Sequence, residues 1–412
     1  MEATAQKLRT CKLIMVTSNN NNKYYEMRED TSHDTFTVLY GRVGGRSSKA
    51  TYNISQWDTK YNEKIRKGYK DQTHLFAETK EDSIELADID DAVVEQLVKE
   101  LMAYASKSIS YNYNVTADQV TEKQVAQAQA ILDELVAKVE ENMDINAFNT
   151  SLLELYQIIP RKMGNVKEHL LKEIDTPAAL EEVQQMLNTE QETLDVMRGQ
   201  VQINEQKKEA IEEKQSINLL EAMGLRIEQE NDPKVIKTIM KKMDDQSTRF
   251  KRAYKVINLR TQKKFDQFLS EKKNKKTELF WHGSRNENWM SIMENGLVLR
   301  PAAVINGKMF GYGLYFADKF QKSLNYTSLR GAYWTGGGEN RAFLALYNVH
   351  VGNQMKIKKH ESWCYDLNEK NLKERNEKYD SLYAKGGADL INNEYIVYNE
   401  AQCTVQYLVE VH

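Results

Sequence analysis

The fold is first indicated by residues 309–326, which read MFGYGLYFADKFQKSLNY. Gly311 and Gly313 precede the β-prone run Leu-Tyr-Phe, so the stretch predicts a tight turn that enters a short strand. A Gly-x-Gly pair also occurs in the phosphate-binding loop of dinucleotide-binding folds, but there a helix follows the glycines. Because a strand pattern follows here, we interpret the two glycines as turn residues that let the loop approach a bound molecule.

Two further stretches in the last third of the chain carry residues suited to chemistry. Residues 281–284 read WHGS and follow a strand-like run, and residues 393–398 read NEYIVY. Taken singly, each candidate has a structural explanation: His282 as a structural histidine, Tyr315 as a core aromatic, Glu394 as an edge-strand charge. Their occurrence together favours a functional site assembled from separate segments.

The hydrophobic pattern divides the chain into three parts. Short β-prone runs separated by polar turns predict a small sheet in residues 11–57, and helical character follows it. From about residue 88 to 215, apolar residues recur at three- to four-residue spacing, which predicts a bundle of five or six helices. From about residue 222 strands return, as in 343–349, mixed with short helices.

Individual helix boundaries are also predicted. We expect helices at 88–104, 116–139 and 150–159, a further helix opened by Thr176-Pro177, and a helix start at Asp232-Pro233. The basic run 272–276 is expected to be a solvated loop, with nuclear import as the alternative.

Length and composition set limits on the class of protein. A chain of 412 residues with 41% hydrophobic and 28% charged residues is typical of a globular protein with two or three domains. It holds no apolar run of membrane-spanning length and no apparent secretory signal. Its three cysteines are far apart, so neither a disulfide framework nor a cysteine-based zinc site is expected, and an intracellular setting is favoured.

The charge is distributed unevenly along the chain. Lys and Arg outnumber Asp and Glu by 14 to 9 in residues 1–80, whereas residues 81–200 hold 9 against 24 and residues 201–412 hold 34 against 27. A basic end beside an acidic middle suggests modules with different partners, although solvated helix faces would give the same asymmetry.

The three stretches, in this order, resemble the catalytic domain of the poly(ADP-ribose) polymerases, which has the diphtheria-toxin-like α+β fold. That family is marked by a His, a Tyr and a Glu on three separate segments, matched here by His282, Tyr315 and Glu394. The resemblance covers residues 222–412. It implies an ADP-ribosyltransferase that uses NAD+ as substrate and needs no metal.

The resemblance also implies a role for each matched residue. Tyr315 and Tyr326 correspond to two aromatic walls around the nicotinamide ring, and the Gly283 backbone and Ser323 hydroxyl to a clamp on its carboxamide. The remaining matched positions are His282, which holds a ribose hydroxyl, Ser284 on the adenosine side, and Lys322 among the NAD-binding residues. Breaking the nicotinamide–ribose bond builds positive charge on the ribose, which explains the need for a carboxylate such as Glu394.

The other two parts resemble further modules of the DNA-dependent members of the family. Residues 85–215 resemble the all-α regulatory helical domain, which blocks the NAD site until a partner loosens it, an allosteric autoinhibition. Residues 1–80 resemble the small α+β WGR module, with Tyr40-Gly41-Arg42 in place of Trp-Gly-Arg. Arg42, Arg46 and Lys49 are the candidates for phosphate or interdomain contacts, with ordinary surface charge as the alternative.

We therefore expect three domains, at 1–80, 85–215 and 222–412. The expected function is poly(ADP-ribosyl)ation of protein acceptors, including the chain itself, stimulated by DNA ends or nicks as in a DNA damage response. Because mono-modifying family members commonly lack the Glu, Glu394 favours elongation. The alternatives are a mono-ADP-ribosyltransferase, an NAD glycohydrolase, and a DNA-break adaptor with weak catalysis. The expected compartment is nuclear in a eukaryote and cytoplasmic in a bacterium.

Overall fold

The computed structural model describes most of the chain in seven stretches: 8–76, 87–114, 119–140, 144–172, 177–212, 217–299 and 309–412. The expected domain ends at residues 80, 85 and 215 lie outside these stretches. The described residues form two compact units, which are treated separately below. Unit 1 holds the described residues up to 76 and residues 106–201, and unit 2 holds 87–105 and the described part of 202–412.

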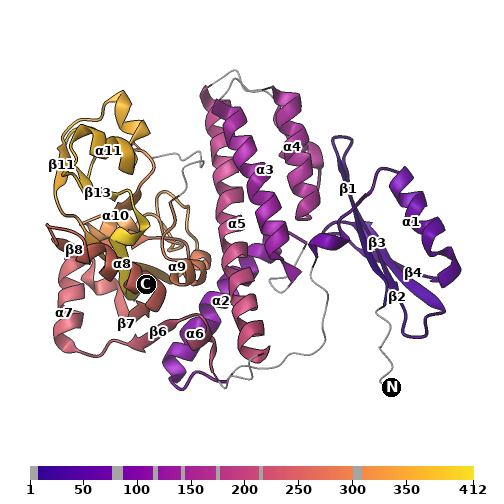
Figure 1. The fold of residues 1–412 in the computed structure, drawn as a ribbon, viewed down its shortest axis with the longest axis horizontal. Coiled ribbons are helices and arrows are strands. Elements are labelled where there is room, and N and C mark those ends of the chain that lie inside the picture. Colours follow the sequence, from indigo (N-terminus) through magenta and orange to yellow (C-terminus); the bar gives the residue numbers. More distant parts are fainter. Residues whose placement is uncertain are drawn as a thin grey trace. The chain divides into compact units, whose positions relative to one another are not determined.

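Unit 1 begins with an antiparallel sheet and one α-helix (Figure 1). Its strands are β1 (Thr10–Thr17), β2 (Asn21–Glu29), β3 (Thr35–Arg42), β4 (Ser47–Asn53) and β5 (Lys70–Asp71), in the order β4-β3-β2-β1-β5. Helix α1 (Trp57–Arg66) packs on one face, where the Trp57 ring meets the Phe36 ring edge-on at 5.1 Å. The sheet and single helix agree with the pattern read from residues 11–70.

Four long helices follow in the described ranges, where the sequence had predicted five or six. They are α2 (Ala92–Asn112), α3 (Glu122–Glu140), α4 (Ile145–Ile158) and α5 (Pro177–Glu212). Helix α4 begins earlier than predicted because the Asp144 side chain accepts a hydrogen bond from the Asn146 backbone N–H. After α4 the chain forms only a short 3-10 turn, Val166–His169, and α5 continues for 36 residues. No helix in the described ranges is both long and apolar enough to span a membrane.

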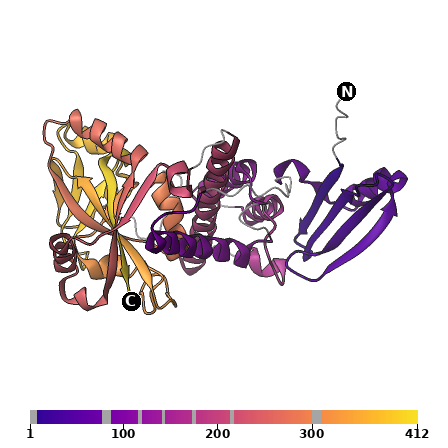
Figure 2. The same ribbon diagram turned by 90° about the horizontal axis from the view of Figure 1, so that it is seen from below.

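Unit 2 is built on two β-sheets (Figure 2). The first sheet holds β6 (Leu225–Gln229), β7 (Phe250–Asn258), β14 (Cys403–Val411), β10 (Ala342–His350) and β8 (Thr277–Gly283), in that order. The second holds β11 (Gln354–Ile357), β12 (Ser381–Ala384), β13 (Glu394–Val397) and β9 (Leu314–Phe316). The helices are α6 (Leu219–Ala222), α7 (Pro233–Lys242), α8 (Leu259–Ser270), α9 (Trp289–Asn295), α10 (Phe320–Leu324) and α11 (Glu369–Arg375). The Asp232 side chain caps α7, as the Asp-Pro pair predicted.

The first half of α2 belongs to the core of unit 2. Val94, Leu97 and Leu101 are buried in the same cluster as the strand residues of the first sheet. An ion pair supports this packing: Arg341, which precedes β10, contacts Glu100 of α2 at 2.8 Å and the buried Glu410 at 3.0 Å. The sequence pattern had assigned this segment to the helical module alone.

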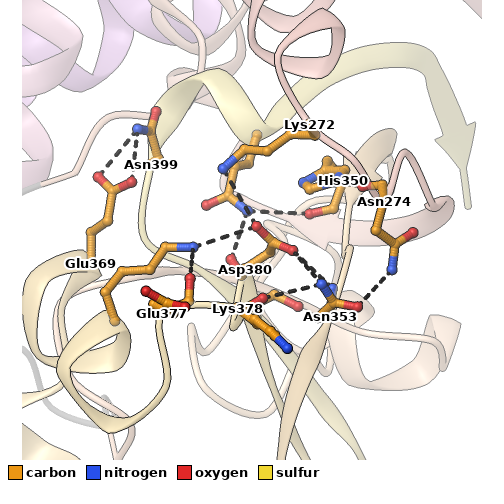
Figure 3. A network of polar contacts seen from close by, with 12 residues as sticks. Lys272, Asn274, His350, Asn353, Glu369, Glu377, Lys378, Asp380 and Asn399 are labelled. Atoms are coloured by element: carbon orange, nitrogen blue, oxygen red, sulfur yellow. Dashed lines mark hydrogen bonds and ion pairs between the residues drawn. The ribbon is translucent and has the colours of Figure 1, made fainter.

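A polar network around Asp380 ties several loops of unit 2 together (Figure 3). The Asp380 carboxylate contacts Lys272 at 3.4 Å and Lys373 at 3.5 Å, and it accepts a hydrogen bond from the Asn353 backbone N–H at 3.0 Å. The backbone carbonyl of Asp380 accepts a further bond from Gln402. The basic run 272–276 forms the loop before β8, and Lys272 helps to hold it in this network.

Candidate active site

The candidate site lies where the two sheets of unit 2 meet. Trp281 of β8 and Ala317, next to β9, exchange two backbone hydrogen bonds of 2.9 and 3.0 Å. Strand β9 also pairs with β13, where Tyr315 lies opposite Ile396. This geometry brings the three separate sequence stretches together: 281–284, 309–326 and 393–398.

His282 is oriented by the backbone of the second stretch. Its Nδ1 lies 3.1 Å from the Tyr315 carbonyl oxygen. Burial lowers the pKa of His282 below its ordinary value, against the opposing effect of this hydrogen bond. The ring is therefore neutral at neutral pH, with Nδ1–H donating to the carbonyl and Nε2 left as an acceptor.

Gly283 and Ser323 are in close backbone contact. A Cβ on Gly283 would lie 1.9 Å from the Ser323 carbonyl oxygen, so no other residue fits this position. Ser323 is buried at 4% exposure on α10. The two residues that the sequence assigned to one clamp are therefore neighbours.

Tyr315 and Tyr326 both lie near Glu394 but are held differently. The Tyr315 hydroxyl donates to the Gly311 carbonyl at 2.9 Å and accepts from the Phe310 N–H at 3.0 Å. Burial raises the pKa of both tyrosines, and the nearby Glu394 carboxylate raises it further. The neutral Tyr315 hydroxyl therefore stabilises its own loop through two hydrogen bonds, whereas Tyr326 keeps 42% of its surface exposed.

The two glycines before Tyr315 serve contacts within the protein. Gly311 has φ +71°, and a Cβ there would lie 2.1 Å from the Leu367 carbonyl oxygen. A Cβ on Gly313 would lie 2.2 Å from the Ile396 side chain. They are turn residues, as predicted, but in the described structure they permit close packing against Leu367 and Ile396.

Glu394 is paired on one side and free on the other. Its Oε1 forms an ion pair with the Lys322 ammonium. Its Oε2 is buried and has no hydrogen-bond partner among the residues that the structure describes. One carboxylate oxygen is therefore fixed by a cation and the other can accept a proton or a hydroxyl hydrogen.

Asp318 and Asn393 hold the Glu394 segment, and sequence reasoning gave neither a role. The Asn393 amide donates to the Asp318 carboxylate at 2.8 Å, and its own oxygen accepts from the Gly386 N–H at 3.0 Å. The Tyr395 hydroxyl lies 3.4 Å from the same Asp318 oxygen. Both residues lie within the quoted stretches, close in sequence to Tyr315 and Glu394. That closeness was the one feature of the sequence that could have predicted a role for them in the site.

Ser284 directly follows the last residue of β8. Its hydroxyl accepts a hydrogen bond of 2.9 Å from the Asn288 amide, and the sequence pattern gave Asn288 no role. Asn288 immediately precedes α9, so this bond ties the end of β8 to the start of that helix.

The five N-terminal candidate residues lie on unit 1 and differ in their surroundings. Arg42 donates to the carbonyl oxygens of Met163 and Gly164, at 3.2 and 2.7 Å, so its guanidinium contacts the loop that follows helix α4. Gly41 is needed because a Cβ there would lie 2.7 Å from the Arg46 carbonyl oxygen. Tyr40, Arg46 and Lys49 are exposed.

The C-terminal part of the chain is similar to known proteins. A model of the poly(ADP-ribose) polymerase catalytic domain matches residues 230–412. The chain is also 33% identical over 189 residues to a poly(ADP-ribose) polymerase-like protein, 100L, of Invertebrate iridescent virus 6; the match covers 44% of this chain and 96% of the viral protein. The chain belongs to the poly(ADP-ribose) polymerase family.

Other similar proteins differ in how far the similarity extends. The uncharacterised protein 101L of the same virus is 35% identical over 194 residues, covering 47% of this chain and 78% of that protein. Poly(ADP-ribose) polymerase 1 of Danio rerio is 25% identical over 325 residues, covering 71% of this chain but 30% of the fish protein. This member of the family is an NAD+-dependent ADP-ribosyltransferase.

Proposed function

We propose that this enzyme transfers ADP-ribose from NAD+ to protein acceptors and then elongates the product, with Glu394 at the reacting carbon. The observation that carries the proposal is the geometry of the Glu394 carboxylate. Lys322 fixes Oε1, and the buried Oε2 has no partner among the described residues. A buried oxygen without a partner is costly unless a bound molecule supplies the hydrogen bond.

The first step breaks the bond between the nicotinamide nitrogen and the ribose C1′. The bonding electron pair leaves with the ring, which becomes neutral nicotinamide, and positive charge develops on the ribose. In this proposal Oε2 of Glu394 accepts a hydrogen bond from the ribose 2′-hydroxyl, and the carboxylate stabilises the developing cation. The acceptor hydroxyl then attacks C1′ and gives its proton to the carboxylate.

The other residues of the site bind and orient the substrate. The neutral His282 ring offers Nε2 to a second ribose hydroxyl, because its Nδ1–H is used by the Tyr315 carbonyl. Tyr315 and Tyr326 flank the flat nicotinamide ring, and the backbone of Gly283 with the hydroxyl of Ser323 holds its carboxamide. Ser284 contacts the adenosine half, at the end of β8.

Labelled NAD+ tests transfer and elongation. Incubation of the full chain followed by gel electrophoresis should give a protein-bound smear, and a single sharp labelled band would indicate mono-modification. Free ADP-ribose without protein-bound label would indicate an NAD glycohydrolase. The Glu394→Gln variant should lose the labelled product, and its retention would contradict the assigned role.

We also propose that the helical segment and the N-terminal sheet regulate this activity in response to DNA ends or nicks. Two features of unit 1 support this. Hydrogen bonds join the sheet to residues 161–166, which follow helix α4; on the sheet side they involve Asn20, Asn22 and Arg42. A ligand bound to the sheet would therefore act directly on the segment that follows α4. Tyr40, Arg46 and Lys49 lie exposed on the β3–β4 hairpin, where a ring and two cations suit a nucleic-acid end.

A matched pair of charge reversals tests the DNA proposal. Lys49 lies on β4 at one edge of the sheet, and Lys70 lies on β5 at the opposite edge; both are exposed. Lys49→Glu should weaken stimulation by nicked or blunt DNA, and the difference from the parent chain should shrink as salt rises, because the variant makes fewer phosphate contacts. Lys70→Glu should leave stimulation near that of the parent chain. Equal effects of the two variants, or no stimulation by DNA of the parent chain, would contradict the proposal.

A further inference from the structure

An exposed aromatic loop adjoins the nicotinamide site. Tyr333 and Trp334 have 74% and 62% of their surfaces exposed. The Trp334 ring stacks on Tyr326, with centroids 6.3 Å apart and planes at 26°, and Tyr333 meets Trp334 edge-on at 4.6 Å. Three aromatic rings therefore form a continuous row that ends at Tyr326.

The backbone of this loop is held in one conformation. The Trp334 N–H donates to the Asn325 carbonyl at 3.1 Å, and the Thr335 hydroxyl donates to the Thr327 carbonyl. The Arg285 guanidinium donates to the Thr335 carbonyl at 3.3 Å, which links the loop to the residue after Ser284. These bonds hold the backbone of Trp334 beside residues 325–327, which places its side chain within reach of Tyr326.

The two walls of the proposed nicotinamide site are fixed by different means. The Tyr315 hydroxyl makes two hydrogen bonds. The Tyr326 hydroxyl has no hydrogen-bond partner among the described residues, and its ring is partly exposed. The orientation of Tyr326 must therefore come from packing, and the Trp334 ring stacks on it.

We propose that Trp334 is a positioning residue for nicotinamide binding: by stacking on Tyr326 it fixes the ring against which nicotinamide packs. This rests on the proposed function, in which Tyr326 is a wall of the nicotinamide site. Trp334 acts through Tyr326 and does not itself touch the reacting atoms. The offset-stacked geometry of the pair is the favourable one for aromatic rings, and such pairs contribute a few-fold to about 10-fold in an equilibrium constant.

Replacement of Trp334 in the full chain tests the proposal. Trp334→Ala should raise the KM for NAD+ and the Kd for nicotinamide, measured by calorimetry, by about 2- to 10-fold. The kcat should change much less, because the reacting groups are untouched. Trp334→Phe should restore most of the affinity, since it keeps a stacking ring, while Trp334→Leu should not. Tyr111→Ala removes another exposed aromatic, which lies in unit 1, and should leave both constants unchanged.

The outcomes separate this inference from the function on which it rests. If Tyr326→Ala leaves nicotinamide binding unchanged, the nicotinamide wall is misassigned and the proposed function fails. If Tyr326→Ala weakens binding but Trp334→Ala does not, the wall stands and the role of Trp334 is overturned. Equal rescue by leucine and phenylalanine would also overturn it, because bulk alone would then explain the effect.

Discussion

The Lys322 ammonium and the Glu394 carboxylate form an ion pair across 72 residues of sequence. Lys322 lies on α10 and Glu394 begins β13, and their side chains are 17% and 10% exposed. The cation offsets the cost of burying the carboxylate. The pair therefore keeps a charged oxygen in the site while leaving Oε2 free.

Glu394→Gln should lower kcat by about 100- to 1,000-fold, because the neutral amide no longer stabilises a developing cation. The Kd for nicotinamide should change little, since the ring and carboxamide contacts remain. Steady-state kinetics and calorimetry on the same preparation check both values. Glu374→Gln changes a carboxylate that is 63% exposed and serves as the control. A parallel loss of binding and kcat would contradict the catalytic role.

The pH dependence of kcat/KM should reflect His282. Its pKa is lowered from the ordinary 6.5, so the ring stays neutral as pH falls to 6.5 and protonates below it. Protonation places a hydrogen on Nε2 and removes the acceptor for the ribose hydroxyl. The His282-dependent part of kcat/KM should be highest at alkaline pH and should reach half of its maximum only below pH 6.5. The difference between the parent and His282→Gln profiles measures this part. A midpoint above pH 6.5 would contradict it.

Gly283→Ala should remove activity by displacing the Ser323 carbonyl, which lies 1.9 Å from the position of the added Cβ. We expect kcat/KM to fall at least about 100-fold, because a shift of about 1 Å at a binding group has effects of this size. Overpacking should also cost about 1–3 kcal/mol of stability. Gly338→Ala is the matched control in unit 2, because its Cβ would meet nothing within 4 Å. Equal kinetics of the two variants would show that the close contact is unimportant.

Glu190→Gln should loosen the helical segment of unit 1. Glu190 is buried on α5 and contacts both Arg161 and the Tyr113 hydroxyl. Leaving the Arg161 charge without its partner should cost about 3–5 kcal/mol. Thermal unfolding measures this cost, and Glu134→Gln, which breaks a pair whose carboxylate is 56% exposed, should have a small effect. If the segment restrains the enzyme, activity without DNA should rise in Glu190→Gln; unchanged activity in a destabilised variant would argue against restraint.

Asp380→Ala should affect stability and leave chemistry intact. The carboxylate is engaged by Lys272, Lys373 and the Asn353 backbone (Figure 3), so its removal leaves several groups unpaired. We expect a loss of about 1–3 kcal/mol in the free energy of unfolding. The kcat at a temperature where the variant is folded should match the parent. Glu377→Ala is the control, because Lys373 contacts only its backbone carbonyl. A lower kcat in folded Asp380→Ala would place the network within the catalytic machinery.

The sequence predicted much of the local structure. Alternating and helical hydrophobic patterns located the strands of the N-terminal sheet and the long helices, because burial of one face of an element requires that periodicity. The Asp-Pro pair at 232–233 predicted the start of α7, since an aspartate accepts the free N–H groups of a first helical turn. The three ordered stretches predicted the catalytic domain and the residues His282, Tyr315 and Glu394 as members of one site.

Contacts between distant segments were not predictable in the same way. The first half of α2 has the pattern of any amphipathic helix, and only packing shows that Leu97 and Leu101 join the core of unit 2. Arginine is usually a solvent-exposed residue, yet the Arg42 guanidinium donates hydrogen bonds to the carbonyl oxygens of residues 163 and 164.

The residue types and their order along the chain are enough to predict an ADP-ribosyltransferase domain. Only the packing of distant segments shows the Lys322–Glu394 pair, the Asn393–Asp318 bond and the stack of Trp334 on Tyr326. The physical reason is that periodicity reports which face of an element is buried, whereas the identity of its partner depends on how the elements pack across tens of residues of sequence.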